Sequence, residues 1–290
     1  MTTTFPVTRW KIGAVTVTRV IETEGPMPAG FLYAEATPER IEQHAWLRPH
    51  FLAADGRLIG SIHAFVVESQ GRRIVVDTCV GNDKPRAVKH WNLRQGRFLE
   101  DLAAAGFARE SIDTVLCTHL HVDHVGWNTM LVDGRWVATF ARARYLFGRR
   151  EWEHWSREAE GADAAVMQDS VRPIIEAGLA RLVEADERLT GEVWLEPTPG
   201  HTPGHVSVRI ASQGAEAVIT GDLMHHPVQC AEPDWANRFD VDADAARATR
   251  RAFLARYCGR PVLVLGTHFA TPTAGRIAQD GAAWRFEPQT

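Results

Sequence analysis

The sequence has no hydrophobic run long enough to cross a membrane. A transmembrane helix needs ~20 consecutive apolar residues, and no segment of the 290-residue chain supplies them. The first residues, MTTTFPVTRWKIG, have no apolar core of the kind that a secretory signal needs. We therefore expect a cytoplasmic protein that does not associate with membranes.

Basic residues are not in excess either. The chain has 32 Lys and Arg against 36 Asp and Glu, which gives a formal net charge of −4. Non-specific nucleic-acid binding needs a clustered basic face, so a nucleic-acid partner is not expected. Hydrophobic residues make up 45% and charged residues 23% of the chain, a balance typical of a folded globular protein rather than a disordered one.

Cysteines are few and widely spaced. The four residues Cys79, Cys117, Cys230 and Cys258 form no CxxC pair, so a disulfide framework is not expected. Cys117 lies in the apolar run TVLCTH, where a buried and inert thiol is the favoured interpretation. Histidine is the more informative residue, because several of the 13 histidines fall in tight clusters.

Hydrophobic periodicity predicts strands and helices that alternate in both halves of the chain. Strands are predicted over residues 15–21, 61–69, 72–78, 113–119, 136–147, 193–200, 205–212, 215–222 and 261–268. Helices are predicted near residues 38–46, 94–106, 149–158, 164–178 and 243–257, the fourth interrupted by Pro173. Because no Pro/Ser-rich linker separates the halves, we expect a single α/β domain over residues 1–290, with two packed sheets and outer helices.

The central segment, THLHVDHVG, has the composition of a metal site. His119 and His121 are two residues apart at the end of a predicted strand, so their side chains point to the same face. Asp123 and His124 follow at a turn that Gly126 permits. Burying four such side chains is costly unless a cation compensates them. Imidazole with carboxylate suits zinc, iron or manganese, whereas the alternative is a polar surface loop.

Three later segments have the same form, an apolar strand that ends in a potential ligand. His201 follows the strand in LEPTPGH, Asp222 ends AVITGD, and His268 ends LVLGTH. Ligands gather beyond strand ends in α/β sheets, so these residues are expected to converge on one cleft with the central motif. Singly each signal is weak, since a lone histidine after a strand is more often satisfied by hydrogen bonds.

The motifs HLHVDH, PGHTPGH, GD and GTH, in this order between about residues 60 and 270, resemble those of the metallo-β-lactamase-fold hydrolases. The resemblance implies an αββα sandwich of two packed mixed β-sheets flanked by helices. It also implies two divalent metal ions, with zinc preferred and iron or manganese as alternatives. The implied ligands are His119, His121 and His201 for the first ion, Asp123, His124 and His268 for the second, and Asp222 as the bridge. Asp77, in VVDTCVG, would orient a metal-bound imidazole.

Within the family, GDLMHHPVQ (residues 221–229) resembles the methyl-parathion-hydrolase-like branch, which includes esterases, lactonases and organophosphate hydrolases. The N-acyl-homoserine lactonases carry a catalytic tyrosine where this chain has His225. That histidine would either hydrogen-bond the substrate oxygen or brace its loop, and the adjacent His226 competes for the assignment. His205 is expected to be structural.

The resemblance therefore implies hydrolysis of a lactone, a carboxylic ester or a phosphotriester by a hydroxide that bridges two metals. Asp123 would transfer the proton to the leaving group. A small-molecule substrate is expected, and Trp91, Trp127, Trp152 and Trp155 either shape its pocket or belong to the core. Residues 22–50 are interpreted as a long loop that forms a lid or a dimer contact, and a homodimer is plausible from the family only. The alternatives are an iron-dependent oxidoreductase or dioxygenase on the same fold, and a non-catalytic metal-binding scaffold.

Overall fold

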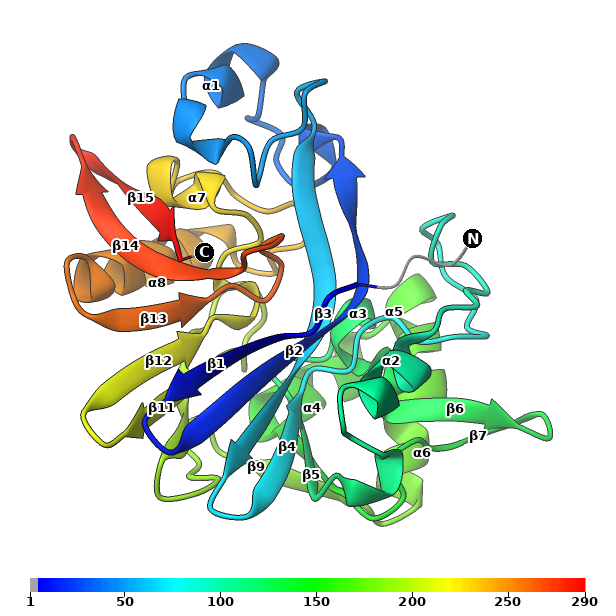
Figure 1. Ribbon diagram of the computed structural model, residues 1–290. Helices are drawn as coiled ribbons and strands as arrows, with labels where there is room; N and C mark the ends of the chain where they lie inside the picture. Colours follow the sequence, from blue (N-terminus) through cyan, green and yellow to red (C-terminus); the bar gives the residue numbers. More distant parts are fainter. Residues whose placement is uncertain (1–4, 290) are drawn as a thin grey trace.

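Two mixed β-sheets packed face to face form the centre of the protein (Figure 1). The computed structural model describes residues 5–289. The first sheet has the order β1-β2-β3-β4-β5-β8-β9 and the second β10-β11-β12-β13-β14-β15. The strands of the first sheet are β1 (Thr8–Ile12), β2 (Val15–Met27), β3 (Leu58–Ser69), β4 (Arg72–Val76), β5 (Thr114–Cys117), β8 (Arg144–Gly148) and β9 (Ala180–Val183). Those of the second are β10 (Val193–Pro197), β11 (Val206–Ser212), β12 (Ala215–Ile219), β13 (Val262–Leu265), β14 (Ala274–Asp280) and β15 (Ala283–Pro288).

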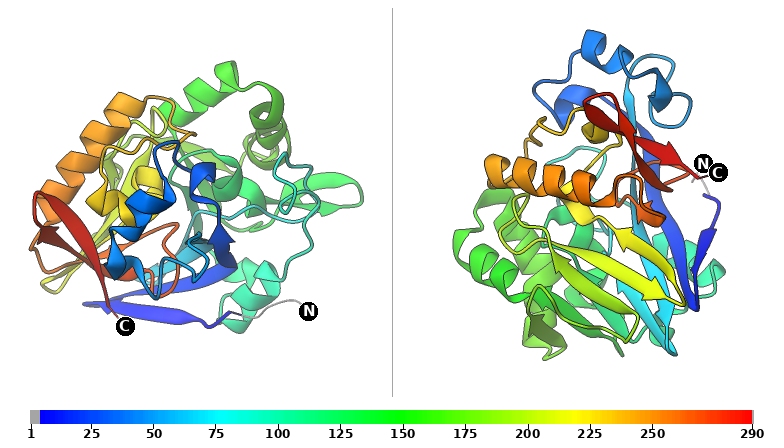
Figure 2. Two further views of the ribbon diagram at one scale, coloured as in Figure 1. Left: turned by 90° about the horizontal axis from the view of Figure 1, so that it is seen from above. Right: turned by 90° about the vertical axis from the view of Figure 1, so that its left-hand side faces the viewer.

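Helices lie on the outer sides of both sheets. Figure 2 shows α8, in orange, on the outer side of the second sheet. The α-helices are α1 (Pro38–Glu42), α2 (Phe98–Ala104), α3 (Val122–Val125), α4 (Arg149–Glu158), α5 (Gly161–Val166), α6 (Arg172–Glu176), α7 (Val228–Ala231) and α8 (Ala243–Tyr257). Short 3₁₀ turns are η1 (Ala29–Phe31), η2 (Ala45–Leu47), η3 (Arg109–Ser111), η4 (Gly126–Asn128) and η6 (Gly221–Leu223), and η5 (Met167–Val171) is a π-helical stretch between α5 and α6. A hairpin of β6 (Thr129–Val132) and β7 (Arg135–Ala138) projects at the right of Figure 1.

The strand alternation explains why the molecule has layers. In β3, Phe65 and Val67 face the second sheet, whereas Ala64 and Val66 face the helices on the other side. The core between the sheets contains valine, leucine and isoleucine from both of them. Phe253 and Leu254 of α8 cover the outer face of the second sheet. The αββα sandwich expected from the resemblance is thus confirmed.

Most predicted elements are present, and the turns between them have the expected chemistry. The predicted hairpin over residues 61–78 is β3–β4, and its turn residues Gln70 and Gly71 have φ of 51° and 77°. The helix predicted over residues 94–106 is α2, which ends before Gly106 at φ of 98°. The helix predicted over residues 243–257 has the bounds of α8.

Two expectations about local structure were wrong. Residues 22–27, predicted as loop, continue β2, which pairs with β3 along its whole length despite a register irregularity between Ile21 and Thr23. No strand was predicted after residues 261–268, but β14 and β15 add a hairpin there. The helix predicted over residues 164–178 is interrupted by the π-helical stretch η5, and Pro173 follows it in the first turn of α6.

The topology sets several strand ends along one edge of the sandwich. In the first sheet β4, β5 and β8 are parallel. In the second, β10 and β12 are each antiparallel to β11, and β12 is parallel to β13. The segments that follow β5, β10, β12 and β13 can therefore meet at one place.

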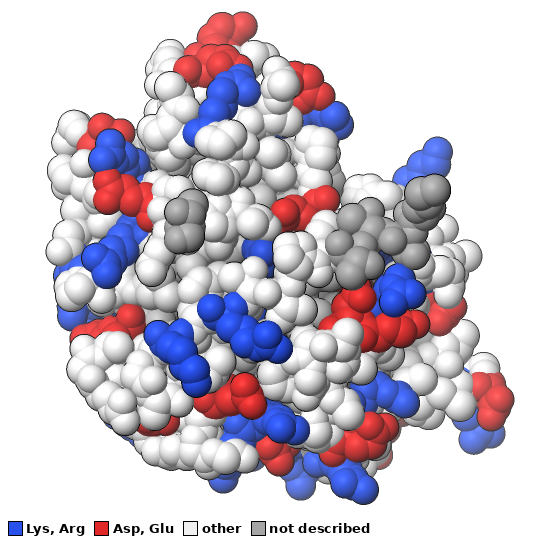
Figure 3. All heavy atoms as spheres, viewed as in Figure 1, with Lys and Arg blue, Asp and Glu red and all other residues white. Residues whose placement is uncertain are grey.

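The described residues include no helix that is long and apolar enough to cross a membrane. Acidic and basic side chains are interspersed over the face drawn in Figure 3. This mixed distribution agrees with the absence of a basic excess in the sequence.

Candidate metal centre

The structure brings all seven predicted ligand residues together at this edge. His119 and His121 follow β5, Asp123 and His124 lie in α3, and the remaining three follow β10, β12 and β13. The ligand atoms of each of four groups lie within 4.8 Å of one another. The groups are His119 with His121 and His201, His119 with His124 and Asp222, Asp123 with His124 and His268, and His201 with Asp222 and His225.

Two glycines are needed at the site for different reasons. Gly221 has φ of 57°, and a Cβ there would lie 2.5 Å from His205 Nε2, so the residue before Asp222 must be glycine. Gly126 has an ordinary helical φ of −58°. A Cβ at Gly126 would lie 1.9 Å from the Val80 carbonyl oxygen, so close packing, and not the turn conformation predicted from sequence, requires this glycine.

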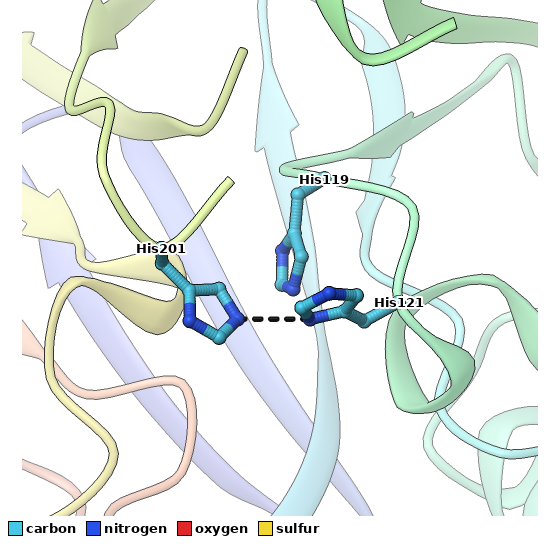
Figure 4. A group of neighbouring side chains, drawn as sticks. All are labelled: His119, His121 and His201. Atoms are coloured by element: carbon cyan, nitrogen blue, oxygen red, sulfur yellow. Dashed lines mark hydrogen bonds between the residues drawn. The ribbon is translucent and has the colours of Figure 1, made fainter. Parts of the chain in front are cut away.

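His119, His121 and His201 converge from two loops (Figure 4). The Nε2 atom of His201 lies 2.9 Å from Nδ1 of His121. The buried Nε2 of His119 has no hydrogen-bond partner among the described residues and lies 3.7 Å from Asp222 Oδ2. Three ring nitrogens therefore surround one point beside a carboxylate.

Partners on the far side of the rings fix which nitrogen faces this point. His201 Nδ1 lies 2.8 Å from Asp240 Oδ1, which can only accept a proton, so Nε2 of His201 carries a lone pair. The Thr118 hydroxyl donates to the Asp77 carboxylate at 2.9 Å and therefore accepts from His119 Nδ1 at 3.1 Å. The inward Nε2 of His119 therefore also carries a lone pair. Lone pairs that face each other repel unless a cation lies between them.

The second group is built in the same way. His268 Nδ1 donates to the Ser61 carbonyl oxygen at 2.9 Å, so Nε2 is the nitrogen that faces the site and could serve as a ligand. That Nε2 lies 3.2 Å from His124 Nε2 and 3.0 Å from Asp222 Oδ1. The Oδ2 atom of Asp123 lies 3.7 Å from the same nitrogen of His268. Asp222 thus stands between the two groups.

Burial and charge set the protonation of these residues. Burial lowers the pKa of His119, His121 and His201 well below the usual value. Burial alone would raise the pKa of Asp222, but the surrounding histidines, His124 first, hold it well below the usual range. Burial alone would lower the pKa of His124 and His268 too, but the Asp222 carboxylate outweighs it, so that the pKa of His124 lies well above the usual value and that of His268 is raised to about 8. His119, His121 and His201 are thus neutral beside an ionised Asp222, whereas His124 and His268 would release a proton when a metal ion binds.

This donor set fits a pair of divalent cations. The seven residues offer five imidazoles and two carboxylates. Two of their buried atoms, Asp222 Oδ1 and His119 Nε2, have no hydrogen-bond partner among the described residues. Mixed nitrogen and oxygen ligands suit zinc and its neighbours, whereas magnesium and calcium prefer oxygen alone.

Asp77 lies where the resemblance placed it. Its Oδ2 is 3.0 Å from His124 Nδ1, and its Oδ1 accepts from the Thr118 backbone N–H at 2.8 Å. Asp77 itself has φ of 59°, an uncommon conformation for a non-glycine residue that these contacts hold in place.

Two buried carboxylates that support the site were not predicted. Asp240 holds His201 from an irregular segment that carries no motif. Glu151, in α4, accepts from the backbone N–H groups of Leu120 at 3.3 Å and Gly204 at 2.7 Å. Glu151 therefore joins the loop of His119 and His121 to the loop of His201. Glu151 is the first residue of the segment EWEHW, and nothing in this segment marks it as part of the site.

The structure distinguishes the three uncertain histidines. His225 Nε2 lies 3.0 Å from Asp222 Oδ2, and His225 faces the site. His226 turns away, with Nε2 2.9 Å from the Phe51 carbonyl oxygen. His205 accepts from the Asp222 backbone N–H at 2.7 Å and contacts Thr198 through Nδ1, so it supports Asp222 from behind.

A cavity of about 820 Å³ opens above these residues. Its walls are mostly apolar, and they include Phe31, Trp91, Trp155 and Phe239. Of the four tryptophans considered for the pocket, Trp91 and Trp155 line it. Trp127 is instead a core residue whose Nε1 donates to Glu22, and Trp152 packs against the core.

The family model described as the metallo-beta-lactamase superfamily matches residues 58–256. The chain therefore belongs to this superfamily, and the resemblance drawn from its motifs is confirmed.

Among its curated relatives is an N-acyl homoserine lactonase of Bacillus cereus, 24% identical over 173 residues, which are 54% of this chain and 61% of that protein. Another is a probable metallo-hydrolase, Rv2300c, of Mycobacterium tuberculosis, 25% identical over 186 residues and 57% of each chain. The chain thus spans about three fifths of the length of the curated relatives it matches.

Solved structures of similar fold include AidC, a dizinc quorum-quenching lactonase, with a TM-score of 0.82, 19% identity and coverage of 98% of this chain and 97% of that one. The hydrolase AbOPH has a TM-score of 0.80, 23% identity and the same coverage. These relatives do not favour the iron-dependent oxidoreductase that the sequence left as an alternative.

Proposed function

We propose that the protein is a metal-dependent hydrolase that opens a lactone or cleaves a carboxylic ester or a phosphotriester. The observation that carries the proposal is the convergence of the inward Nε2 atoms of His119, His201 and His268, each ring held by a partner at Nδ1, on the ionised Asp222. This arrangement lies at the floor of a largely apolar cavity. The printed descriptions of the similar proteins, lactonases and hydrolases, support the same class of reaction.

In the proposed assignment, His119, His121 and His201 would hold one cation, Asp123, His124 and His268 would hold the other, and Asp222 would be a ligand of both. Zinc is the preferred ion, because five of the seven ligands are imidazoles and zinc stands high in the affinity order of divalent metals. Bound there, the two cations would supply Lewis acidity and make water a nucleophile near neutral pH.

The residues of the chain have separate roles in this proposal. Asp123 lines the cavity and is partly exposed to it, so its carboxylate can carry a proton to the leaving group. His225 also lines the cavity, and its Nδ1 has no hydrogen-bond partner among the described residues. The backbone N–H of His225 donates to Gln229 Oε1 at 2.8 Å, and Tyr33 donates to the same oxygen at 2.9 Å. We assign His225 to hydrogen bonding of the substrate oxygen from this fixed position.

The cavity walls favour a small uncharged molecule with an apolar part. Trp155 stands beside His121, with ring centroids 5.2 Å apart, and Phe31 and Phe239 face each other at 5.5 Å. Such walls bind hydrocarbon and aromatic groups by removing them from water.

Substitution of the central ligands tests the proposal. We expect His121→Ala and Asp222→Ala to lose bound metal and to lose hydrolysis of a panel of lactones, aryl esters and phosphotriesters, whereas the control His50→Ala retains both. Metal is measured by elemental analysis of the same samples. Hydrolysis at the normal rate by metal-free protein would refute the assignment, and oxygen uptake by iron-loaded protein would favour redox chemistry. No turnover of any substrate by fully metallated protein would favour a binding scaffold.

A further inference from the structure

Lys84, Arg86 and Asp169 form a buried cluster of charges that includes none of the residues of the metal centre. The guanidinium of Arg86 binds the Asp169 carboxylate with both terminal nitrogens, at 2.7 and 2.8 Å. Lys84 Nζ lies 3.6 Å from Asp169 Oδ1 and donates to Thr129 Oγ1 at 2.7 Å. The exposed fractions of the Lys84, Arg86 and Asp169 side chains are 0%, 3% and 7%. Burying this many charges is costly, and stability alone is poorly served by it.

The two cations belong to a loop that is closed on itself. Backbone hydrogen bonds join Asp83 to Arg94 at 3.0 Å and Leu93 to Lys84 at 2.8 Å. The tip, residues 85–91, forms one wall of the cavity through Pro85, Val88 and Trp91. Within residues 5–289, every hydrogen bond or ion pair that joins this tip to another segment runs from Arg86 to Asp169 or Ser170.

Asp169 belongs to the segment that forms a neighbouring wall. Ala162 and Val166 of α5 line the cavity, and the chain then passes directly into the π-helical stretch η5, which contains Asp169. A π-helical turn is uncommon and is found frequently at functional sites. Here the Asp169 carboxylate binds Arg86, while Val166 and Ala162, about one and two turns earlier, face the cavity.

We propose that Asp169 is a positioning residue that fixes the separation of these two walls and so determines which apolar substrate groups the cavity accepts. The inference rests on the proposed hydrolase function. A bidentate Arg–carboxylate pair sets both distance and orientation, and this pair joins the tip of the loop to η5, whereas Lys84 anchors the base of the loop to Thr129. Release of the pair would therefore change binding of the apolar part of the substrate and leave the metal centre in place.

The test compares a short and a long ester of one leaving group, 4-nitrophenyl acetate and 4-nitrophenyl octanoate. For Asp169→Asn we expect KM for the octanoate to rise about fivefold or more, with kcat, metal content and KM for the acetate within about twofold of wild type. Asp169→Asn leaves two buried cations without a carboxylate, so the double variant Asp169→Asn/Lys84→Met, which keeps the net charge of the cluster, is measured beside it. Glu216→Gln, which breaks the ion pair with Arg209 away from the cavity, is the matched control.

Amide hydrogen exchange of the metallated proteins gives a readout that does not depend on turnover. We expect exchange in residues 84–93 to become about tenfold faster in both Asp169 variants and to stay unchanged in Glu216→Gln. Unchanged exchange in this loop, equal KM changes for both esters, or loss of kcat together with metal would each overturn the inference. If the wild-type protein hydrolyses neither ester while binding metal, the proposed function fails first, and exchange alone then decides whether Asp169 holds the loop.

Discussion

At the scale of the residue, the site depends on what holds the far side of each ring. Asp240, Ser61 and Thr118 hold His201, His268 and His119 at Nδ1, so that Nε2 of each ring faces the site. All seven residues that the sequence offered as ligands lie together in the structure, because each follows an apolar strand in a recognisable motif. The sequence did not predict Asp240 or Glu151, since these carboxylates reach the site through contacts between segments distant in sequence, and no local pattern records such contacts.

Replacement of Asp240 by asparagine removes the charge that orients His201. We expect the affinity for zinc to fall about tenfold or more, because partners of a ligating imidazole raise its basicity and fix its orientation. Competition with a chelator of known affinity measures the effect. Asp234→Asn, which weakens an exposed ion pair with Arg251, serves as control, and equal affinity of the two variants would show that Asp240 has no such role.

Replacement of His225 by phenylalanine removes the proposed contact to the substrate oxygen. We expect kcat/KM to fall about 10- to 100-fold, in the range of a lost transition-state hydrogen bond, with both metal ions retained. His226→Gln, at a residue that faces Phe51, should leave kcat/KM near wild type. Wild-type kinetics in His225→Phe would mean that this histidine only braces its loop.

At the scale of the element, elements with strong periodicity and clear ends were predicted best. Helix α8 has an amphipathic pattern and an N-cap, Asp242, whose side chain accepts from the Ala245 N–H. The end of β2 was missed because Gly25 and Pro26 are typical of loops, yet they pair there with Gly60 and Ile59. The hairpin β14–β15 was missed because its strands are largely polar outside a few buried positions such as Ile277 and Phe286.

The loop that contains Lys84 should make stability depend on pH. Burial lowers the pKa of Lys84 from 10.5 to about 7, so between these values the unfolded chain binds more protons than the folded one. The cost of burying the charge is absent above pH 10.5, grows as pH falls toward 7 and is complete below it. We expect Lys84→Met to remove this dependence, with a difference of the order of a few kcal/mol in unfolding free energy between pH 6 and pH 10.

Urea unfolding at several pH values measures this difference for both proteins. Lys11→Met, at a lysine on the protein surface that contacts Thr16, is the control. A stability difference between the wild-type protein and Lys84→Met that stays constant from pH 6 to pH 10 would contradict the assigned pKa of Lys84.

At the scale of the whole molecule, the two sheets bring together residues that are up to 149 positions apart, from His119 to His268. The fold could be predicted because the strand-end motifs have the order of the family. The shape of the cavity could not, since its walls include the irregular segments 28–32, 85–91 and 238–241, whose conformation depends on contacts such as Arg86 with Asp169. A homodimer, and a lid or dimer-contact role for residues 22–50, stay predictions, and sedimentation of the protein tests the dimer.

Metal binding should stabilise the whole fold, because the ligands come from both sheets. A ligand at 1,000 times its Kd stabilises the folded state by ~4 kcal/mol, which for a chain of this size corresponds to a rise in Tm of roughly 10 °C. Thermal unfolding with and without zinc measures this shift. An identical Tm in both conditions would contradict a metal centre that bridges the sheets.

The most direct measurement is a zinc titration of metal-free protein, followed by lactone and aryl ester hydrolysis in the same samples. Activity should rise with added zinc and level off at about two equivalents per chain, and Asp222→Ala should show neither binding nor activity. Full activity before any zinc is added, or saturation of the site with no hydrolysis of any ester or lactone, would contradict the proposal that these seven side chains form a dinuclear hydrolytic centre.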